Sequence, residues 1–199
     1  MADTKISAMA AATTPLTGAE LVPLVQSGVN VRSTIAGVAQ YSRSNFSNYG
    51  AFSSSVDQTG SITAGTAMTF NSTDIVGGVT LASNSRLTVP VTGTYNIQFS
   101  AQFDNVENAQ QIATIWFRVN GTDVVKSATN ITVPARKSAN INGYGVASWN
   151  IFLDMTAGQY VEIMWLPEIA SLTLQALPAG TTPTYPAIPS VIATVNQVG

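Results

Sequence analysis

The chain has 199 residues, of which 45% are hydrophobic and 9% charged, and its formal net charge is −2. It contains no cysteine and no histidine, which excludes disulfides, thiolate metal sites and a Ser-His catalytic pair. Its 8 basic residues are scattered, so we expect no electrostatic binding to nucleic acid or to an anionic membrane surface.

The low charged content indicates a surface that is polar but nearly uncharged. Ordinary soluble domains carry about 25% charged residues, and here Ser, Thr, Asn, Gln and Gly take their place. Burying neutral amides and hydroxyls costs far less than burying ions, so this composition favours large buried contacts over a solitary monomer. No apolar run reaches the roughly 18 residues of a membrane span, and the N-terminus lacks the apolar core of a signal peptide.

Residues 1–40 differ from the rest of the chain because they contain no aromatic residue. Residues 21–26 predict a short extended piece, with Pro23 confining it to an edge, and Ser27 to Asn30 form a turn signal. Ser33 or Thr34 can cap one or two helical turns that follow. The segment has too few apolar residues for a core of its own, so we expect a docking arm that is ordered against a partner, the alternative being a disordered tail. Its expected docking residues are Leu16, Leu21, Val22, Leu24, Val25, Ile35 and Val38.

Residues 41–49 are polar and aromatic and are interpreted as a linker. From Gly50 to the C-terminus the pattern is all-β, with short alternating runs separated by Gly, Pro and Asn turns. Residues 94–103 alternate most regularly, and Asn120-Gly121 is the favoured pair for a type I′ turn. Residues 178–189 hold four prolines and are not expected to form regular sheet. The strands expected before and after these are 51–56, 65–70, 74–81, 86–90, 111–119, 122–126, 131–133, 171–177 and 191–195.

Residues 143–166 predict two further strands, 146–155 and 160–166, joined as a hairpin by the turn 156–159. Both faces of this hairpin carry large apolar side chains, whereas an antiparallel strand with one solvated face should be half polar. One face can fill the core, and a neighbouring subunit is the simplest cover for the other. Which face meets that subunit is left open. The expected subunit contacts are Trp149, Ile151, Leu153, Tyr160, Val161, Ile163 and Trp165.

About ten short strands without a convincing helix predict an all-β, antiparallel two-sheet sandwich or jelly roll for residues 50–199. A parallel arrangement would need crossover helices, which the sequence does not predict.

The order of these strands resembles the C1q/TNF-like jelly roll over about residues 51–198. The resemblance rests on Val91-Thr92-Gly93-Thr94-Tyr95-Asn96-Ile97-Gln98-Phe99, and on Ala157-Gly158-Gln159-Tyr160-Val161 after an apolar strand. It implies a homotrimer whose subunits pack through aromatic and aliphatic residues near a three-fold axis.

The first forty residues resemble the short segment that opens many tailed-bacteriophage virion proteins, especially tail fibres and head-surface fibres. The matching parts are Lys5-Ile6-Ser7, the run from Leu16 to Gly28, and Thr34 to Val38. The resemblance implies attachment to the particle, through a capsid or tail protein. Because this chain has no long shaft between arm and head, it favours a capsid decoration, or head fibre, over a long fibre.

Several groups of residues could bind a ligand or a substrate. Asp104 and Glu107, or Asp154, Glu162 and Glu168, would be the carboxylates of a glycosidase, but nothing in the sequence sets the required spacing. The alternative for Glu162 is a surface ion pair with Arg118. Oxygens near 104–108, from Asp104, Asn105, Glu107 and Asn108, could bind calcium, although they lack EF-hand spacing. Aromatic residues that could stack on sugars are Tyr144, Tyr185 and Phe46.

The sequence therefore predicts a non-enzymatic, homotrimeric structural protein on the surface of a tailed-phage virion, with no cofactor and no metal. The alternative is a short tail fibre or receptor-binding module that recognises host-surface glycan, and a third is a depolymerase.

Overall fold

The structure is a computed structural model that describes residues 16–44 and 48–199. The chain divides into two compact units, Met1–Phe46 and Ser47–Gly199, which are named the arm unit and the head unit. The predicted arm motif at Lys5 to Ser7 and the predicted sugar-stacking Phe46 lie outside the described residues.

The arm unit consists of a hairpin and a helix. Strand β1 (Leu21–Gln26) pairs antiparallel with β2 (Val29–Thr34), and α1 (Ile35–Ser44) follows directly. Ser27 and Gly28 make the turn with φ angles of 51° and 77°, both positive as a type I′ turn requires. The predicted extended piece and helix start are confirmed. The sequence did not predict β2, because its first residues were assigned to the turn, and α1 extends into residues predicted as linker.

The first sheet of the head unit is 7-stranded, with the order β4-β15-β9-β18-β3-β6. β15 and β18 pair with successive parts of β9 along one of its edges, and β13 pairs with the opposite edge over the whole length of β9. All its pairings are antiparallel. Its strands are β3 (Tyr49–Ser54), β4 (Gln58–Thr59), β6 (Ser72–Gly77), β9 (Gly93–Asn105), β13 (Gly143–Met155), β15 (Leu172–Leu174) and β18 (Val191–Gln197).

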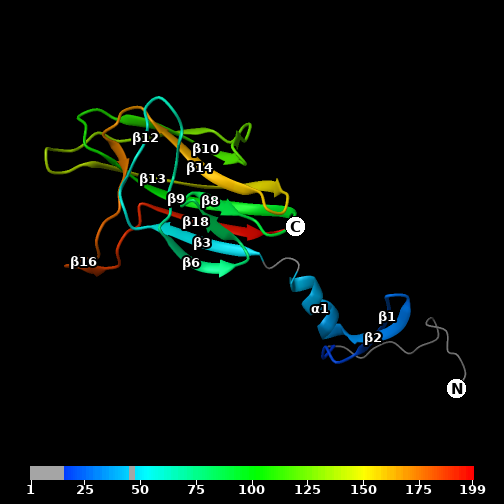
Figure 1. The fold of residues 1–199 in the computed structure, drawn as a ribbon. Helices are drawn as coiled ribbons and strands as arrows, with labels where there is room; N and C mark the ends of the chain where they lie inside the picture. The colour runs from blue at the N-terminus through cyan, green and yellow to red at the C-terminus, as the bar shows by residue number, and fades with distance from the viewer. Residues whose placement is uncertain (1–15, 45–47) are drawn as a thin grey trace, which may run out of the picture. The chain divides into compact units, whose positions relative to one another are not determined.

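The second sheet is also 7-stranded, in the order β11-β10-β14-β8-β7, with β12 on β10 and β5 on β14. In Figure 1 the strands β10 and β14 lie above β18, β3 and β6, so that the two sheets form a sandwich. The strands of the second sheet are β5 (Thr66–Ala67), β7 (Thr80–Ala82), β8 (Arg86–Thr88), β10 (Gln111–Val119), β11 (Thr122–Asp123), β12 (Thr129–Val133) and β14 (Tyr160–Pro167).

The chain changes sheets between β9 and β10, between β12 and β13, and again between β13 and β14. Repeated crossing between two antiparallel sheets is the connectivity of a jelly roll, and this confirms the predicted fold class. A third, two-stranded sheet, β16 (Gly180–Thr181) with β17 (Thr184–Tyr185), stands in the region predicted to lack regular sheet.

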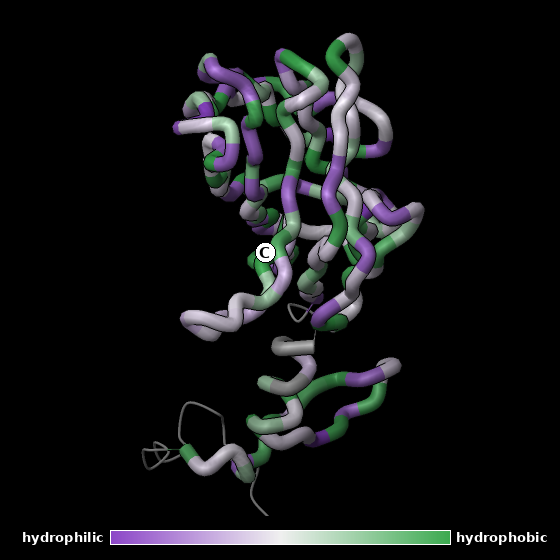
Figure 2. The backbone as a smooth tube through the Cα atoms, turned by 90° about the vertical axis from the view of Figure 1, so that its left-hand side faces the viewer, coloured by the Kyte–Doolittle hydropathy of each residue, from purple (hydrophilic) through white to green (hydrophobic). Residues whose placement is uncertain are grey.

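The core lies between the two sheets and follows from period-two alternation. Along β9 the predicted inward side chains are buried, and the intervening polar side chains face outward. In Figure 2, hydrophobic and hydrophilic positions accordingly interchange along the long strands. Aromatic rings of both sheets meet in this core, as in the edge-to-face pairs Phe99–Phe117, with ring centroids 5.9 Å apart, and Phe103–Trp165, at 5.8 Å.

Several predicted strands are confirmed and others are shorter. Residues 94–103, 111–119 and 191–195 lie in β9, β10 and β18, and Asn120 and Gly121 have the expected positive φ angles of 47° and 82°. By contrast, only Thr66 and Ala67 of the predicted strand 65–70 pair, and residues 74–81 divide between β6 and β7, which belong to different sheets.

The predicted hairpin of residues 146–166 is wrong. β13 pairs along its whole length with β9 of the first sheet, whereas β14 pairs with β10, β8 and β5 of the second. Residues 156–159 therefore carry the chain from one sheet to the other. Alternation in the sequence identified both strands correctly, but it carries no information about which strand each one pairs with.

The cover for the second face of β14 comes from the chain itself. Met164 on that face is only 2% exposed. Gly65 lies over it, since a Cβ atom there would collide with the Trp116 ring and stand 3.6 Å from the Met164 Cε. The segment leading into β5 thus takes the place that the sequence had suggested for a neighbouring subunit.

Candidate assembly surfaces

The described part of the arm unit, residues 16–44, exposes apolar side chains. None of the side chains described between Leu16 and Tyr41 is buried. Of the seven predicted docking residues, four are exposed, Leu16 (46%), Leu21 (57%), Val25 (67%) and Val38 (44%), while Val22, Leu24 and Ile35 are half-buried. A groove of about 630 Å³ lies between the hairpin and the helix, lined in part by Leu24, Val31, Val38 and Tyr41. An apolar unit of this size gains too little from its own contacts to be stable alone.

Local hydrogen bonds set the shape of the arm before any partner binds. The Glu20 carboxylate accepts hydrogen bonds from Thr17 N, Thr17 Oγ1 and Gly18 N, each at 2.7 Å. These bonds, foremost that from the Thr17 backbone, lower the pKa of Glu20 from 4.5 to about 2. Ile35 N and Ala36 N donate to the carbonyls of Glu20 and Gly18, each at 2.9 Å, and Gly37 N donates to the Thr34 Oγ1 cap at 3.0 Å.

This network explains the sequence pattern Leu-Thr-Gly-Ala-Glu-Leu at residues 16–21. Gly18 has a φ of 88°, a conformation that L side chains rarely adopt, and a Cβ there would meet the Ala36 Cβ at 3.3 Å. The motif therefore folds the chain back onto the first turn of α1 and presents the neighbouring apolar residues outward.

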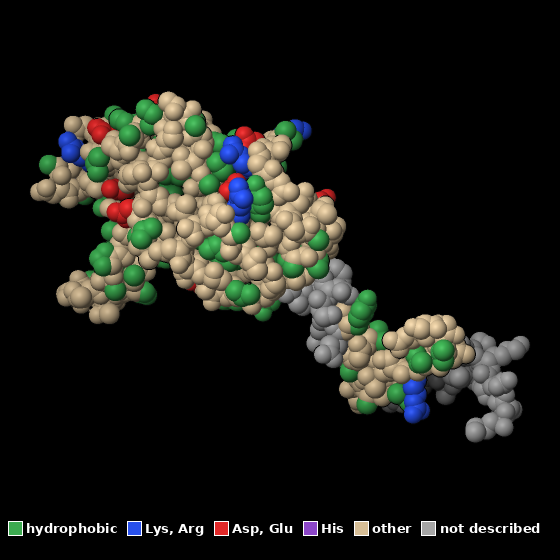
Figure 3. All heavy atoms as spheres, in the orientation of Figure 1, with side chains coloured by type: hydrophobic (Ala, Val, Ile, Leu, Met, Phe, Trp, Pro, Cys, Tyr) green, Lys and Arg blue, Asp and Glu red, His purple; other side chains and the backbone are tan. Residues whose placement is uncertain are grey.

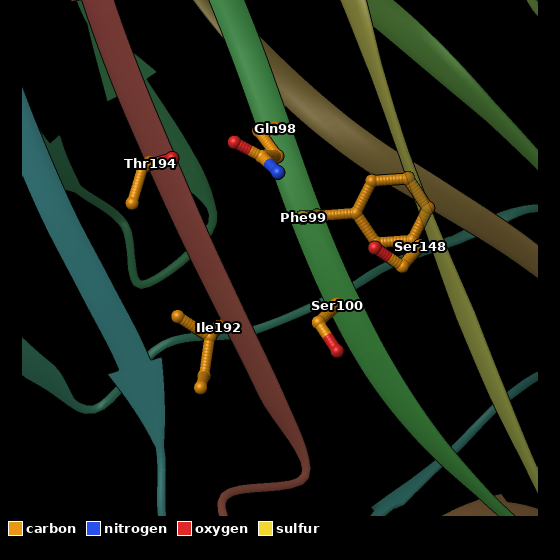
Figure 4. A pocket seen from close by; sticks show the side chains of 6 residues that line it. All are labelled: Gln98, Phe99, Ser100, Ser148, Ile192 and Thr194. Atoms are coloured by element: carbon orange, nitrogen blue, oxygen red, sulfur yellow. The ribbon is translucent and has the colours of Figure 1, made fainter.

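The outward side of the first sheet is the second candidate surface, and it is polar but almost uncharged. Asn150 Nδ2 donates to Asn96 Oδ1 at 2.9 Å across β13 and β9, which illustrates how amides pair on this side. The outward side chains at the centre of β9, β13 and β18 are named the neutral face: Asn96, Gln98, Ser100, Gln102, Ser148, Asn150, Ile192, Thr194 and Asn196. A shallow hollow of about 250 Å³ lies within it, where Figure 4 shows the small side chains of Ser100, Ser148 and Thr194.

Large apolar side chains border the neutral face. Tyr144, Val146 and Phe152 project from the edge strand β13 and are 55%, 61% and 59% exposed. They alternate with the inward residues Trp149, Ile151 and Leu153, which pack against the core. Exposed apolar groups beside a neutral polar surface are typical of a protein contact region. Figure 3 shows few charged side chains on the visible face of the head unit.

The structure separates the seven residues predicted for subunit contacts. Val161, Ile163 and Trp165 are 0% exposed within a single chain, so they belong to its core and leave no surface for another subunit. Trp149, Ile151 and Leu153 are half-buried on the inward side of β13, and Tyr160 is half-buried beneath Arg86, whose guanidinium lies 4.5 Å from the ring centroid. The outward set of β13, above all Phe152, is exposed instead. The sequence could have identified this outward set, because its members alternate along β13 with Trp149, Ile151 and Leu153.

The side chains considered for catalysis or calcium binding near residues 104–108 make separate structural contacts. Glu107 Oε1 accepts from Ser171 Oγ at 2.7 Å, and Asn108 Oδ1 accepts from Arg136 Nε at 2.8 Å. Asn105 Nδ2 donates to the carbonyls of Ala109 and Pro134, both at 2.9 Å. Within residues 16–44 and 48–199, no three His, Cys, Asp or Glu side chains gather as a metal site would require.

The remaining predicted acids lie in different surroundings. Glu162 accepts from Ser85 Oγ at 2.7 Å and pairs with Arg86 at 3.7 Å, whereas Arg118 pairs with Asp123 at 2.6 Å, so the predicted pair of Glu162 with Arg118 does not form. Asp154 accepts from Thr94, and Glu168 accepts from Ile112 N.

Asp104 is buried at 5% exposure, as is Glu162 at 9%. The Oδ2 of Asp104 accepts from Asn142 Nδ2 at 3.0 Å and from Gln175 Nε2 at 3.4 Å, while its Oδ1 has no hydrogen-bond partner. Burial raises the pKa of Asp104, the bond from Asn142 opposes this, and the charge of Asp57 adds to the rise.

The sequence matches no family model and no curated protein. Among solved structures, the chain is similar to the globular domain of zebrafish complement 1qA protein, with 11% sequence identity, a TM-score of 0.45, and coverage of 76% of this chain and 98% of that one. The strand pairing of this chain, rather than that likeness, establishes its jelly-roll fold. In the part of the chain that the structure describes, no helix is long and apolar enough to span a membrane.

Proposed function

We propose that this chain is a non-enzymatic structural protein on the surface of a tailed-phage virion, a homotrimeric capsid decoration or head fibre that is anchored by its N-terminal arm. The arm, residues 1–40, binds a capsid or tail protein, and the jelly-roll head associates with two further copies of itself. The protein needs no cofactor for either task.

The observation that carries the anchoring role is that no side chain described between Leu16 and Tyr41 is buried. The apolar side chains of the arm unit point outward from a hairpin and helix that local hydrogen bonds already shape, so a partner gains apolar contact at a reduced ordering cost. The resemblance of residues 16–28 to the opening segment of phage virion proteins indicates that this partner is a component of the particle.

The neutral face supports self-association of the head. Neutral amides and hydroxyls are desolvated at lower cost than ions, and Phe152, Val146 and Tyr144 supply apolar area beside them. An obligate trimer needs contacts of about 2,000 Å² or more. The neutral face extends over the three paired strands β13, β9 and β18.

The anchoring role is tested with Val25→Asp, which places a charge on an exposed apolar position of β1. Loss of one buried valine contact costs about 1.5 kcal/mol, so we expect at least a roughly tenfold drop in binding. The matched control is Ser27→Asp, which adds the same charge at the exposed turn residue of the hairpin, outside the residues that line the groove.

Both variants are supplied to a phage that lacks its own copy of the gene, and the purified particles are imaged and immunoblotted. We expect Ser27→Asp protein on the particles and Val25→Asp protein only in the unbound fraction. Equal incorporation of both variants would contradict the assignment of the arm. Equilibrium sedimentation of the full chain tests the homotrimer separately, and a stable monomer would exclude it.

A second candidate is a short tail fibre or receptor-binding module for host-surface glycan. The head unit has two distinct ends, since Tyr49 at the start of β3 pairs with Asn196 near the C-terminus, whereas Ser54 pairs with Val191 at the other end. Tyr144, 55% exposed, pairs with Asp104 at that other end, and Tyr185, 45% exposed, lies in β17 shortly before β18 begins there. Glycan-array binding that is lost in Tyr144→Ala, with Val125→Ala as an exposed control, would favour this function over a purely structural one.

A further inference from the structure

A projecting finger, residues 178–187, leaves the head unit between β15 and β18. Leu177 and Ile188 close its neck with two reciprocal backbone hydrogen bonds of 2.9 Å. Beyond the neck, β16 and β17 form the finger itself, and every residue of it except Gly180 is exposed. Figures 1 and 3 show it standing clear of the sandwich. Among the residues described, no hydrogen bond connects the finger with the sandwich.

The finger has a composition that suits contact and not solvation. From Ile169 to the C-terminal Gly199 the sequence has no Asp, Glu, Lys or Arg. Prolines at 178, 183, 186 and 189 restrict its backbone, which lowers the entropy lost when the finger binds. A two-stranded hairpin is marginally stable by itself, so an exposed uncharged hairpin of this kind gains stability when another surface covers it.

Tyr185 is the largest side chain of the finger, and one side of its ring is already occupied. The ring lies across Gly180 of the paired strand, where any Cβ atom would collide with it. The side chain remains 45% exposed. It is therefore an exposed aromatic knob, a side chain that is already oriented by the strand beside it, and aromatic anchors of this kind contribute strongly to protein contacts.

A groove of about 350 Å³ at the neck offers a complementary site. It is lined by Ser53, Ser55, Ala176, Leu177, Pro178, Ala187, Ile188 and Pro189, all of them uncharged. The groove is continuous with the neutral face, because Ser53 pairs directly with Ile192, which lines the hollow of that face. Pockets that hold small ligands have volumes of about 300–1,000 Å³, so the groove has room for one inserted side chain.

We propose that the finger of each subunit reaches to the neighbouring subunit of the homotrimer and places Tyr185 in that subunit's neck groove. The partner is a second copy of this chain, since knob, groove and neutral face share the same lack of charge and form one continuous surface. The contact joins two different patches, so it is heterologous and closes on itself when three copies surround an axis. This inference rests on the proposed homotrimer and adds a specific clasp to it.

The absence of cysteine allows a direct test. In a full-length Ser55→Cys variant, which keeps Tyr185, the single thiol lies in the neck groove and is reacted with a maleimide reagent at a protein concentration where sedimentation shows the trimer. The matched control is Val125→Cys, because Val125 is 84% exposed in the loop after β11 of the second sheet. We expect Ser55→Cys to label at least about tenfold more slowly than the control, as a site covered nine-tenths of the time would, and at the control rate after unfolding in urea.

A second variant reports on the knob. Tyr185→Ala combined with Ser55→Cys is expected to label at the Val125→Cys rate, because the groove is then no longer filled. If the protein sediments as a trimer while Ser55→Cys with Tyr185 intact labels as fast as Val125→Cys, the clasp is refuted and the homotrimer stands. In that case the accessible finger becomes a candidate contact for host glycan. If the wild-type chain sediments as a monomer, the proposed homotrimer fails first.

Discussion

Asp104→Asn is predicted to stabilise the protein at neutral pH. Asp104 lies on the outward side of β9 but is covered by its neighbours, and two acceptor atoms in this place lack a donor, Asp104 Oδ1 and Gln175 Oε1. An asparagine keeps one oxygen to accept from Asn142 and gains an amide that can donate to Gln175. The change therefore removes a buried charge and provides a missing hydrogen bond at once.

The magnitude follows from these two groups. A buried polar group without a partner costs about 1–3 kcal/mol, so satisfying Gln175 and neutralising residue 104 should raise the free energy of unfolding by about 1–2 kcal/mol at pH 7. For a chain of this size, that corresponds to a rise in Tm of about 2–8 °C.

The sign of the pH dependence is equally specific. The pKa of Asp104 is raised in the folded state, so the wild-type carboxyl favours folding while it is protonated and loses that contribution as pH rises through its folded pKa. The advantage of Asp104→Asn is thus greater at pH 7 than below pH 3.8, the ordinary value for an aspartate, where the carboxyl is protonated, neutral and able to donate a hydrogen bond of its own.

Urea unfolding of the full chain at pH 7 and at pH 3.5, at one fixed protein concentration, measures both effects. Asp154→Asn serves as the control, because Asp154 is exposed and accepts one hydrogen bond from Thr94. A less stable Asp104→Asn protein at pH 7, or an equal gain at both pH values, would refute this account of Asp104.

Three further predictions concern the arm, the cover over β14 and the reassigned contact residues. Glu20 should titrate with a midpoint near 2 rather than 4.5, so the ordering that it gives the arm is complete above pH 4.5 and lost as pH falls through 2, as a carboxyl-detected NMR titration can show. Gly65→Ala should lower the free energy of unfolding by about 1–3 kcal/mol through collision with Trp116, whereas a substitution of the exposed Ala64 by Ser should leave the urea midpoint unchanged. Trp165→Ala should lower the free energy of unfolding by about 3–5 kcal/mol, because Trp165 is buried in the core. Phe152→Ala should leave the secondary-structure signal intact and weaken self-association in sedimentation, because Phe152 is exposed. The reverse pattern would contradict the assignment of Trp165 to the core and of Phe152 to the subunit contact.

Much of the local structure could be predicted from the sequence. The alternation from Tyr95 to Phe103 identifies β9 and its buried face, because side chains on a strand alternate regardless of what the strand pairs with. Asn120-Gly121 and Thr34 specify a turn and a helix cap through their own backbone preferences and hydrogen bonds, and these also need no distant partner. The same local logic indicated that residues 1–40 cannot support a core, in agreement with an arm unit whose described side chains are never buried.

What only the tertiary structure decided is which segments meet. The runs around Trp149 and Trp165 are both strongly apolar and close in sequence, yet they lie in opposite sheets, and it is Gly65 that covers the outer side of β14. Burial on both sides marks a strand as enclosed, but a segment of the same chain can supply the cover as well as another subunit can. The sequence by itself thus determined strands, turns and the low charge, whereas packing decided that Trp165 is buried in the core and that Phe152, Tyr185 and several apolar residues of the arm are exposed.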